Sequence, residues 1–370
     1  LIDVDYDELP VVASIESAMA AEALANEAVP ANLVYQGHRC QDDVDGDFAS
    51  AAYVASGRFI NNRVSASPLE PRGCVARYEW TNGQLTVWSA TQMPSFLKTM
   101  LAIHLAFPEQ RIEVITPQVG GGFGQKAHVH PEEALVCLLA IELGRPVRWI
   151  EDRRENLLSA THAKHQINDM AIAVDGNGRF LAMRNRSSTD GGAYNCLPWT
   201  HLVESHVGAS TLTGPYRIAH FNDESLSLVT NKCPIGAYRG VGWSAGHIAR
   251  EILIDRAARR LGLSPFEIRR RNLVDQNDYP FTTPTGLVIR EGTFVQTLDR
   301  LEQMVSYPSF RERQASALAS GKLLGLGLCI FNEVSGVGTR ALSFLHIPVT
   351  THDTATVRVP VKFLGDLMPG

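Results

Sequence analysis

Hydrophobic and polar positions along the chain predict a mixture of strands and helices. Two β-rich runs at residues 76–80 and 84–88 flank Asn82-Gly83, and this dipeptide between such runs predicts a hairpin. A second hairpin is predicted around Asp175-Gly176-Asn177-Gly178, because glycine and asparagine again separate two β-rich runs. The other expected strands, including the arms of the second hairpin, are at residues 1–6, 112–115, 170–174, 179–184, 323–333 and 354–359.

Helix-start and helix-stop residues delimit several segments. Pro131 in a first turn and Gly144 just past the last turn predict a helix over residues 131–143. Ser264-Pro265-Phe266-Glu267 is a capping box that starts another helix. Strands and helices do not alternate regularly, so the pattern predicts an α+β fold rather than a doubly wound sheet. Further helices are expected at residues 15–26, 94–105, 244–261 and 294–305.

Composition describes an ordinary globular protein. The 370 residues are enough for about two to three domains, with 45% apolar and 20% charged residues. The segment 275–284 carries two prolines and several polar residues, and it is the expected domain junction. A net charge of −5 argues against a nucleic-acid binder, and the densest basic stretch, Arg269-Arg270-Arg271, is too short to change that. No apolar run reaches the roughly 18 residues of a membrane span, so no span is predicted.

The cysteines argue against a local metal cluster. None of the six forms a Cys-x-x-Cys pair, so an iron–sulfur or structural zinc site of the usual spacing is excluded. Reduced and mostly buried thiols are expected, which favours a cytoplasmic location. The six residues are Cys40, Cys74, Cys137, Cys196, Cys233 and Cys329.

The run Gly120-Gly121-Gly122-Phe123-Gly124 is the sharpest local feature of the sequence. Consecutive glycines let a backbone approach a ligand closely and expose its N–H groups. The run is not a phosphate-binding P-loop, because Lys126 is followed by Ala127, and Gln125 breaks a dinucleotide fingerprint. A ligand-binding loop and a tight structural turn both remain open for this segment.

Three further residues are candidates for a site. Arg239 lies between small residues just before a helix and could bind an anionic or oxo ligand, or form a structural ion pair. Gln92 stands at a strand–helix junction, facing a ligand or acting as an ordinary capping residue. Glu70 could be a catalytic carboxylate, pair with Arg72 or lie in solvent.

Histidines near the glycine run could be arranged as a metal site. His128 and His130 would share one face of a strand, with Glu132 and Glu133 following and with His162 and His165 downstream. Nothing in the spacing orders the remaining ligands, so scattered surface histidines are the preferred interpretation. The sequence shows no Ser/His/Asp or Cys/His arrangement for nucleophilic catalysis and no nucleophile elbow.

The order of several motifs carries a family resemblance that no single motif carries. Together they resemble the molybdenum-binding subunit of the xanthine oxidase, aldehyde oxidase and carbon monoxide dehydrogenase family of molybdenum hydroxylases. The motifs are Pro68-Leu69-Glu70-Pro71-Arg72-Gly73, Trp88-Ser89-Ala90-Thr91-Gln92, residues 120–126, Gly144-Arg145-Pro146-Val147-Arg148-Trp149, residues 151–155, Gly191-Gly192-Ala193-Tyr194, Thr230-Asn231, Ala237-Tyr238-Arg239-Gly240 and residues 269–273.

The resemblance implies a fold and a division into domains. It implies a molybdopterin-binding domain of the xanthine oxidase type within an α+β chain. Residues 1–26 would be the tail of a preceding α/β hammerhead domain, and residues 27–280 the first molybdopterin-binding domain. Residues 281–370 would begin a second, truncated molybdopterin-binding domain, so the chain would be about half of the subunit.

The resemblance also implies a cofactor and roles for individual residues. Molybdenum would be held by molybdopterin, with the cytosine dinucleotide form one alternative, and no protein side chain would bind the metal. Gln92 and Arg239 would be the catalytic residues of this chain. Gly121, Gly122, Phe123 and Gly124 would hold the cofactor together with Gln92, Arg239 and Gly240. The glutamate that acts as general base would lie in the absent part.

Partners and substrate follow from the same resemblance. A second part of the molybdenum subunit, a [2Fe-2S] subunit and an FAD subunit would complete a complex that forms a dimer. Water would supply the oxygen for hydroxylation of aldehydes or N-heterocycles. Ala127 stands where xanthine-specific members have glutamate, which disfavours xanthine as a substrate. The Cys-Ser-Phe-Arg signature of carbon monoxide dehydrogenases is absent, which disfavours carbon monoxide. The rival hypothesis is a non-catalytic homologue with a structural or assembly role.

Overall fold

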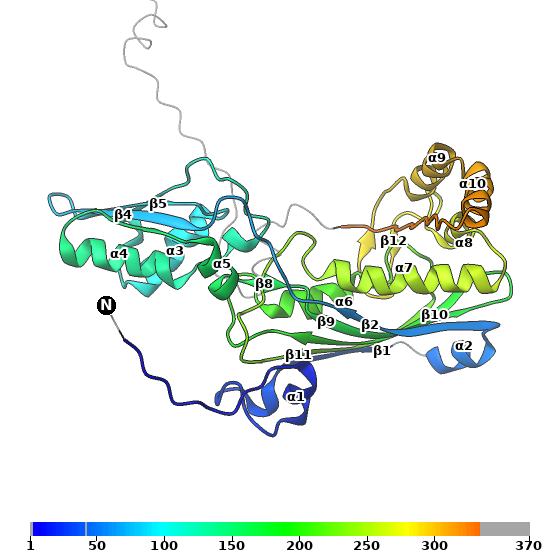
Figure 1. The fold of residues 1–370 in the computed structure, drawn as a ribbon, viewed down its shortest axis with the longest axis horizontal. Helices are drawn as coiled ribbons and strands as arrows, with labels where there is room; N and C mark the ends of the chain where they lie inside the picture. Colours follow the sequence, from blue (N-terminus) through cyan, green and yellow to red (C-terminus); the bar gives the residue numbers. More distant parts are fainter. Residues whose placement is uncertain (1–2, 41–42, 334–370) are drawn as a thin grey trace, which may run out of the picture.

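The computed structural model describes residues 3–40 and 43–333, which form two lobes that are seen side by side in Figure 1. Each lobe consists of a β-sheet covered by helices. The content of helices and strands agrees with the predicted mixture of the two. The strand predicted at 354–359 lies outside the described residues.

The smaller lobe is built on a four-stranded sheet in the order β6-β5-β4-β7. The hairpin predicted around Asn82-Gly83 is confirmed, because β4 and β5 pair antiparallel across it and Gly83 has a φ of +68°. β5 and β6 pair parallel, so the chain crosses over between them through α3. The elements are β4 (Gly73–Glu79), β5 (Gln84–Ser89), α3 (Pro94–His104), β6 (Ile112–Ile115), α4 (Pro131–Leu143) and β7 (Val147–Ile150).

The larger lobe is built on a five-stranded sheet in the order β1-β11-β10-β9-β2. The second predicted hairpin is confirmed, since β9 and β10 pair antiparallel, whereas β10 and β11 pair parallel. Apolar residues of α7, including Leu253 and Ile254, pack on this sheet and form the main core with Ile172 and Phe180. The elements are β1 (Leu33–Cys40), β2 (Tyr53–Asn61), β9 (Gln166–Val174), β10 (Phe180–Asp190), β11 (His220–Leu228) and α7 (Trp243–Arg260).

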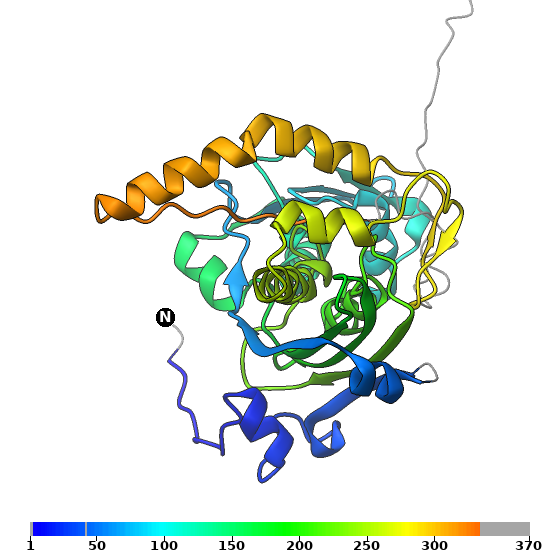
Figure 2. The same ribbon diagram turned by 90° about the vertical axis from the view of Figure 1, so that its right-hand side faces the viewer.

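Three helices lie beyond α7, on the side away from the sheet (Figures 1 and 2). Ser264 caps α8 as predicted, because its Oγ accepts a hydrogen bond from the backbone N–H of Glu267 at 2.9 Å. Arg269 is fully buried and binds the carboxylates of Glu251 and Asp255. One residue of the basic stretch 269–271 therefore forms ion pairs in the protein interior. The three helices are α8 (Pro265–Asn272), α9 (Phe294–Val305) and α10 (Tyr307–Ala319).

The remaining elements of the described chain are short. α1 packs under the larger sheet through Ile15 and Ala18, beside Val12 of the preceding segment. The helix ends earlier than predicted because Ala21 adopts a left-handed conformation with φ +52°. A π-helix, η4 (Val203–Val207), continues into α6 (Gly208–Ser210). The others are α1 (Ile15–Ala20), η1 (Pro30–Asn32), α2 (Val44–Ser50), β3 (Val64–Ser65), η2 (Glu109–Arg111), η3 (Gln125–Ala127), α5 (Arg153–Ser159), β8 (His162–Ala163), β12 (Phe281–Thr282) and β13 (Val288–Ile289).

Two predicted strands and one prediction about the cysteines are wrong. Residues 3–6 and 323–333 pair with no strand of the described chain. In the second segment, buried arginines take the place of a partner strand, since Arg269 and Arg250 donate to the carbonyls of Leu328 and Ile330. Cys74 and Cys137 are buried, whereas Cys196 and Cys233 are half-buried and Cys40 and Cys329 are exposed, so most of the thiols are not buried. No helix of the described part is long and apolar enough to cross a membrane.

Candidate functional site

An open groove of about 1020 Å³ lies between the two lobes, and most of the predicted site residues line it. Gln92 contributes from the start of α3 in the smaller lobe, Phe123 and Gly124 from the glycine loop, and Arg239 and Gly240 from the segment before α7. Gly121 and Gly122 belong to the same glycine loop but are not among the lining residues. The others that line the groove are Met93, Ala127, Trp199, Val203, His206, Val207, Ser210, Thr211, Ala237, Val241, Trp243 and Glu333.

The glycine loop wraps around the side chain of Gln92. The backbone N–H of Gly124 donates to Gln92 Oε1 at 2.9 Å, and a Cβ on Gly122 would lie 2.3 Å from the same oxygen. Gly121 and Gly124 have φ values of +93° and +101°, which side chains rarely adopt. The loop is therefore a tight turn that needs its glycines, and it also forms part of the groove wall.

Gln92 does not cap α3. The hydroxyl of Thr91 accepts from the backbone N–H of Met93 at 3.1 Å, whereas Gln92 accepts from the glycine loop and its Nε2 makes no hydrogen bond with a described residue. The capping interpretation of Gln92 is therefore wrong. A free amide donor in a groove is available to a ligand.

Two segments that are distant in sequence are fixed to one another at the groove. The backbone N–H of Arg239 donates to the carbonyl of Phe123 at 3.0 Å, and that of Ala237 donates to His128 Nε2 at 2.9 Å. A Cβ on Gly124 would lie 2.6 Å from the carbonyl oxygen of Ala237. The glycine loop therefore fixes the position of the segment that carries Arg239.

Arg239 is exposed in the groove and forms no ion pair with a described residue. The alternative of a structural ion pair is therefore wrong for this arginine within the described chain. A guanidinium that is not neutralised by a carboxylate favours an anionic ligand and can donate in a planar fork.

Aromatic and aliphatic side chains form much of the groove wall. Phe123 is 45% exposed, and Trp199, Val203 and Trp243 line the same space. Sequence reasoning missed Val203 because it lies in the π-helix, which has no simple spacing signal, although π-helical turns are frequent at functional sites. The groove therefore combines a few polar groups with a largely apolar wall, as small-molecule sites commonly do.

Glu70 serves the glycine loop and does not pair with Arg72. Its Oε2 accepts from the backbone N–H of Gly120 at 2.7 Å and from Lys126 Nζ at 2.6 Å. Burial alone would raise the pKa of the Glu70 carboxyl, but these bonds outweigh that effect and the pKa is lowered. An ionised, bonded carboxylate suits an anchor of the loop better than a proton acceptor for a substrate.

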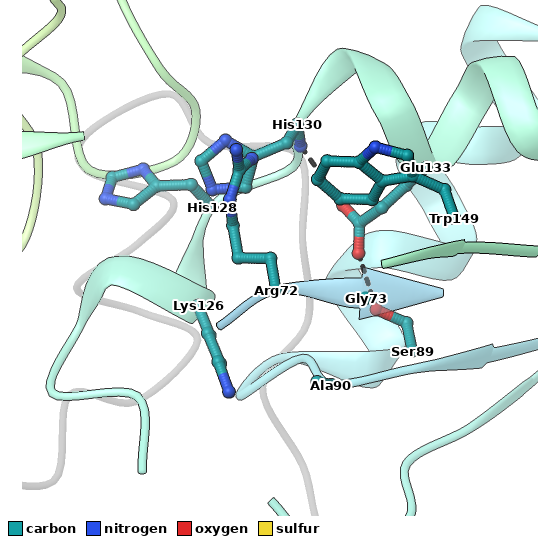
Figure 3. A pocket seen from close by; sticks show the side chains of 9 residues that line it. All are labelled: Arg72, Gly73, Ser89, Ala90, Lys126, His128, His130, Glu133 and Trp149. Carbon is teal, nitrogen blue, oxygen red and sulfur yellow. Dashed lines mark hydrogen bonds between the residues drawn. The ribbon is translucent and has the colours of Figure 1, made fainter. Parts of the chain in front are cut away.

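A small internal cavity of about 10 Å³ lies behind the loop (Figure 3). His128 and His130 line it and are buried, so their interpretation as surface histidines is wrong. Figure 3 shows the Glu133 carboxylate between the Ser89 hydroxyl, which donates at 2.6 Å, and the backbone N–H of His130. No group of three or more histidine, cysteine, aspartate or glutamate residues suited to a metal occurs in the described part.

The residues around this cavity act as a rigid support. Arg72 donates from its backbone and its guanidinium to Glu151, which also accepts from Asn156 at 2.7 Å. Burial lowers the pKa of His128 to about 4, so this histidine is neutral and can accept the bond from the Ala237 segment. The network therefore supports the glycine loop and the segment that carries Arg239 on the side away from the groove.

The groove is built from a glycine loop, an amide donor and a guanidinium, and this donor set suits a bound organic group that carries oxygen atoms or negative charge. The chain belongs to the molybdopterin cofactor-binding domain family, whose model matches residues 25–273. The resemblance derived from the order of the motifs, to the molybdenum hydroxylases, is thereby confirmed.

Relatives with solved structures or known activities support this membership. Quinoline 2-oxidoreductase from Pseudomonas putida 86 is 62% identical with a TM-score of 0.91, over 95% of this chain and 45% of that one. The nicotine 6-hydroxylase large subunit of Paenarthrobacter nicotinovorans is 45% identical over 97% of this chain and 44% of its own length. The carbon monoxide dehydrogenase large chain of Hydrogenophaga pseudoflava is 30% identical over 97% and 47%. The chain thus spans less than half the length of these relatives.

Proposed function

We propose that the groove holds one side of a molybdenum–molybdopterin cofactor in an oxidoreductase that hydroxylates N-heterocycles or aldehydes, with oxygen from water. The observation that carries the proposal is the convergence of Gln92, Phe123, Gly124, Arg239 and Gly240 on one groove in a chain of this family. When bound, the cofactor would supply the two-electron redox chemistry.

The residues of the groove fit such a cofactor. Side chains on Gly122 or Gly124 would collide with Gln92 or Ala237, so the glycines keep the loop backbone close to Gln92 and open to the groove. Gln92 Nε2 and the Arg239 guanidinium are donors without partners in the described chain, and both suit anionic or oxo groups. A volume of about 1020 Å³ gives room for both a pterin and a substrate.

Each residue has a proposed task. Gln92 would donate its amide hydrogens to oxygen atoms of the bound group, while Gly124 holds its Oε1. The backbone of Gly121, Gly122 and Gly124 would let the cofactor approach closely, and the ring of Phe123 would exclude water from its outer side. Arg239, beside Gly240, would bind negative charge on the cofactor or substrate.

The wall of the groove favours a flat aromatic substrate. Trp199, Trp243 and Phe123 offer ring surfaces on which an N-heterocycle can pack. Ala127 lines the groove with a methyl group, so no carboxylate at this position recognises polar purine edges. Two of the relatives are a quinoline oxidoreductase and a nicotine hydroxylase, which supports N-heterocycles over aldehydes.

The proposed assembly follows from the family. Residues 1–26 would be the tail of a hammerhead domain, 27–280 the first molybdopterin-binding domain and 281–370 the beginning of the second. The catalytic glutamate, the iron–sulfur cluster and FAD would come from other parts of a cytoplasmic complex, which would form a dimer. The cytosine dinucleotide form of the pterin is included in the proposal. The rival function is a catalytically incomplete assembly partner.

Arg239→Ala tests the function in the assembled complex. The loss of one or two charge-assisted hydrogen bonds should lower kcat/KM for quinoline by about 10- to 150-fold, or about 1.5–3 kcal/mol. Arg154→Ala, which removes an exposed arginine outside the groove, is the control and should leave kcat/KM unchanged. Equal activities and equal molybdenum contents in both variants and the wild type would show that Arg239 has no such role.

A further inference from the structure

A lysine and a glutamate lie buried beneath the segment that carries Arg239. Lys164, just after β8, is 9% exposed, and its Nζ donates to the carbonyl oxygens of Arg239 at 3.2 Å and Gly240 at 2.6 Å. Both acceptors belong to the groove wall. An ammonium group that binds two successive carbonyls fixes the direction of the peptide planes on either side.

Glu204 holds the same segment from its other end. This residue of the π-helix η4 is 1% exposed, and its Oε2 accepts from the backbone N–H of Gly242 at 3.0 Å. A Cβ on Gly242 would lie 2.6 Å from the Val203 carbonyl oxygen, so segment and π-helix touch backbone to backbone. Residues 239–242 are thus held between a buried cation and a buried anion.

The two charges depend on one another. Burial lowers the pKa of the Lys164 ammonium and raises that of the Glu204 carboxyl, and the attraction between the two groups opposes both shifts. Glu333 also favours the charged lysine, and His247 lies close enough for Lys164 to lower its pKa further. Buried charges are costly unless they are paired and hydrogen-bonded, and here the hydrogen bonds end on the groove segment.

The backbone of Lys164 is also unusual. Its φ is +71°, a left-handed conformation that costs free energy in a residue with a side chain. Strain of this kind persists where the surrounding structure requires the side chain at that place, and it gathers at functional sites. The strained backbone of Lys164 and its two hydrogen bonds to residues 239 and 240 therefore both indicate that this side chain holds the segment in place.

We propose that Lys164 and Glu204 are positioning residues that set the direction of Arg239 in the groove. They act on the proposed reaction through the backbone of residues 239–242 and touch neither cofactor nor substrate. The inference rests on the proposed function for its effect on turnover. The contacts of Lys164 and Glu204 with the backbone of residues 239–242 are called the clamp below. Whether they hold this segment can be tested without any cofactor.

Hydrogen exchange in the assembled complex tests the clamp. Lys164→Met keeps an unbranched apolar chain but removes the ammonium, and Glu204→Leu removes the acceptor for Gly242. In both variants, amide exchange of a peptide covering 237–243 should become at least about tenfold faster, since its bonds open locally more often. Exchange in the buried part of α7 should stay unchanged. Lys164→Arg, which retains a charged donor, should restore part of the protection.

Lys232→Met is the matched control, because the Nζ of Lys232 also donates to a buried group, the carboxylate of Asp190 at 2.9 Å, but Lys232 does not line the groove. It should leave exchange at 237–243 at the wild-type rate. Unchanged exchange in Lys164→Met and Glu204→Leu would overturn the clamp, as would an equal increase in Lys232→Met.

A double-mutant cycle tests whether the clamp acts through Arg239. Lys164→Met should lower kcat/KM for quinoline by about 10- to 100-fold in the wild-type background and by less than about threefold in Arg239→Ala. A full effect in both backgrounds would overturn the link to Arg239. If the wild-type complex contained no molybdenum, the proposed function would fail, and the exchange experiment would still decide whether the clamp exists.

Discussion

Gly124→Ala is the sharpest perturbation of the contact between the two groove segments. Gly124 has φ +101° and ψ −29°, and the added Cβ would lie 2.6 Å from the carbonyl oxygen and 2.8 Å from the carbonyl carbon of Ala237. The neighbour is backbone and cannot rotate away. Hydrogen bonds of Ala237 to His128 and of Arg239 to Phe123 also resist a shift of the segment.

The expected loss of unfolding free energy in Gly124→Ala has two parts. A side chain in a left-handed conformation of this kind costs about 1–3 kcal/mol, and an overpacked contact costs about 1–3 kcal/mol more. Gly286→Ala separates them, because Gly286 has φ +87° but nothing within 4 Å of an added Cβ. We expect Gly286→Ala to lower the free energy of unfolding by about 1–3 kcal/mol, and Gly124→Ala by about 2–6 kcal/mol.

Urea unfolding of both variants and the wild type measures these changes. The two segments form the groove together, so Gly124→Ala should also lower the cofactor content of the purified complex, whereas Gly286→Ala should not. Equal losses of stability in the two variants, with cofactor retained in both, would refute the idea that close contact at Gly124 defines the groove.

Three further predictions concern the support behind the groove and one helix start. Glu151→Gln should destabilise by about 1.5–3 kcal/mol in urea, because the buried Arg72 loses its buried carboxylate partner and keeps only the more exposed Glu132 at 3.3 Å; a loss under about 0.5 kcal/mol would contradict this. His128 has its pKa lowered from 6.5 to about 4 by burial, so its contribution to stability is fully present above pH 6.5 and lost as the pH falls through 4. The stability that His128 loses over this range is about 3 kcal/mol, so His128→Gln should reduce the fall of the urea midpoint between pH 7 and 4, while the buried His130 and His201 keep the rest of that fall. Ser264→Ala should cost about 1 kcal/mol in thermal unfolding through the lost cap of α8, and an unchanged midpoint would count against the cap.

Local signals predicted much of the fold. Asn82-Gly83 marks a hairpin because these residues tolerate positive φ, and Pro131 with Gly144 marks both ends of α4. Such signals depend on neighbours in sequence. The strand predicted at 323–333 failed because a strand needs a distant partner, and here buried arginines bind its carbonyls.

The motifs pointed to residues of the candidate site, but they did not predict the hydrogen-bond partners and burial of the residues around it. The order of motifs identified Gln92, the glycine loop and Arg239, and the fold brings Gln92, Phe123, Gly124 and Arg239 to one groove. The partner of Glu70 is Lys126, 56 residues away, and no sequence pattern distinguished it from Arg72. Burial of His128 likewise depends on packing between segments 109 residues apart.

The clamp could not be found from sequence for the same reason. Lys164 and Glu204 are a lone lysine and a lone glutamate in unremarkable surroundings, and they are related only through the backbone of residues 239–242. Their role depends on burial and on distances between loops. Neither burial nor the distances between loops can be read from the spacing of residues along the chain.

The content of molybdenum and pterin in the complex, purified with its native partners under molybdate supply, decides whether the groove holds the cofactor. Elemental analysis together with fluorescence of the oxidised pterin measures both per chain. We expect equimolar metal and pterin in the wild type and in Gly286→Ala, and a large loss of both in Gly124→Ala. Persistent absence of metal from a fully assembled wild-type complex would contradict the proposed function and favour the assembly partner.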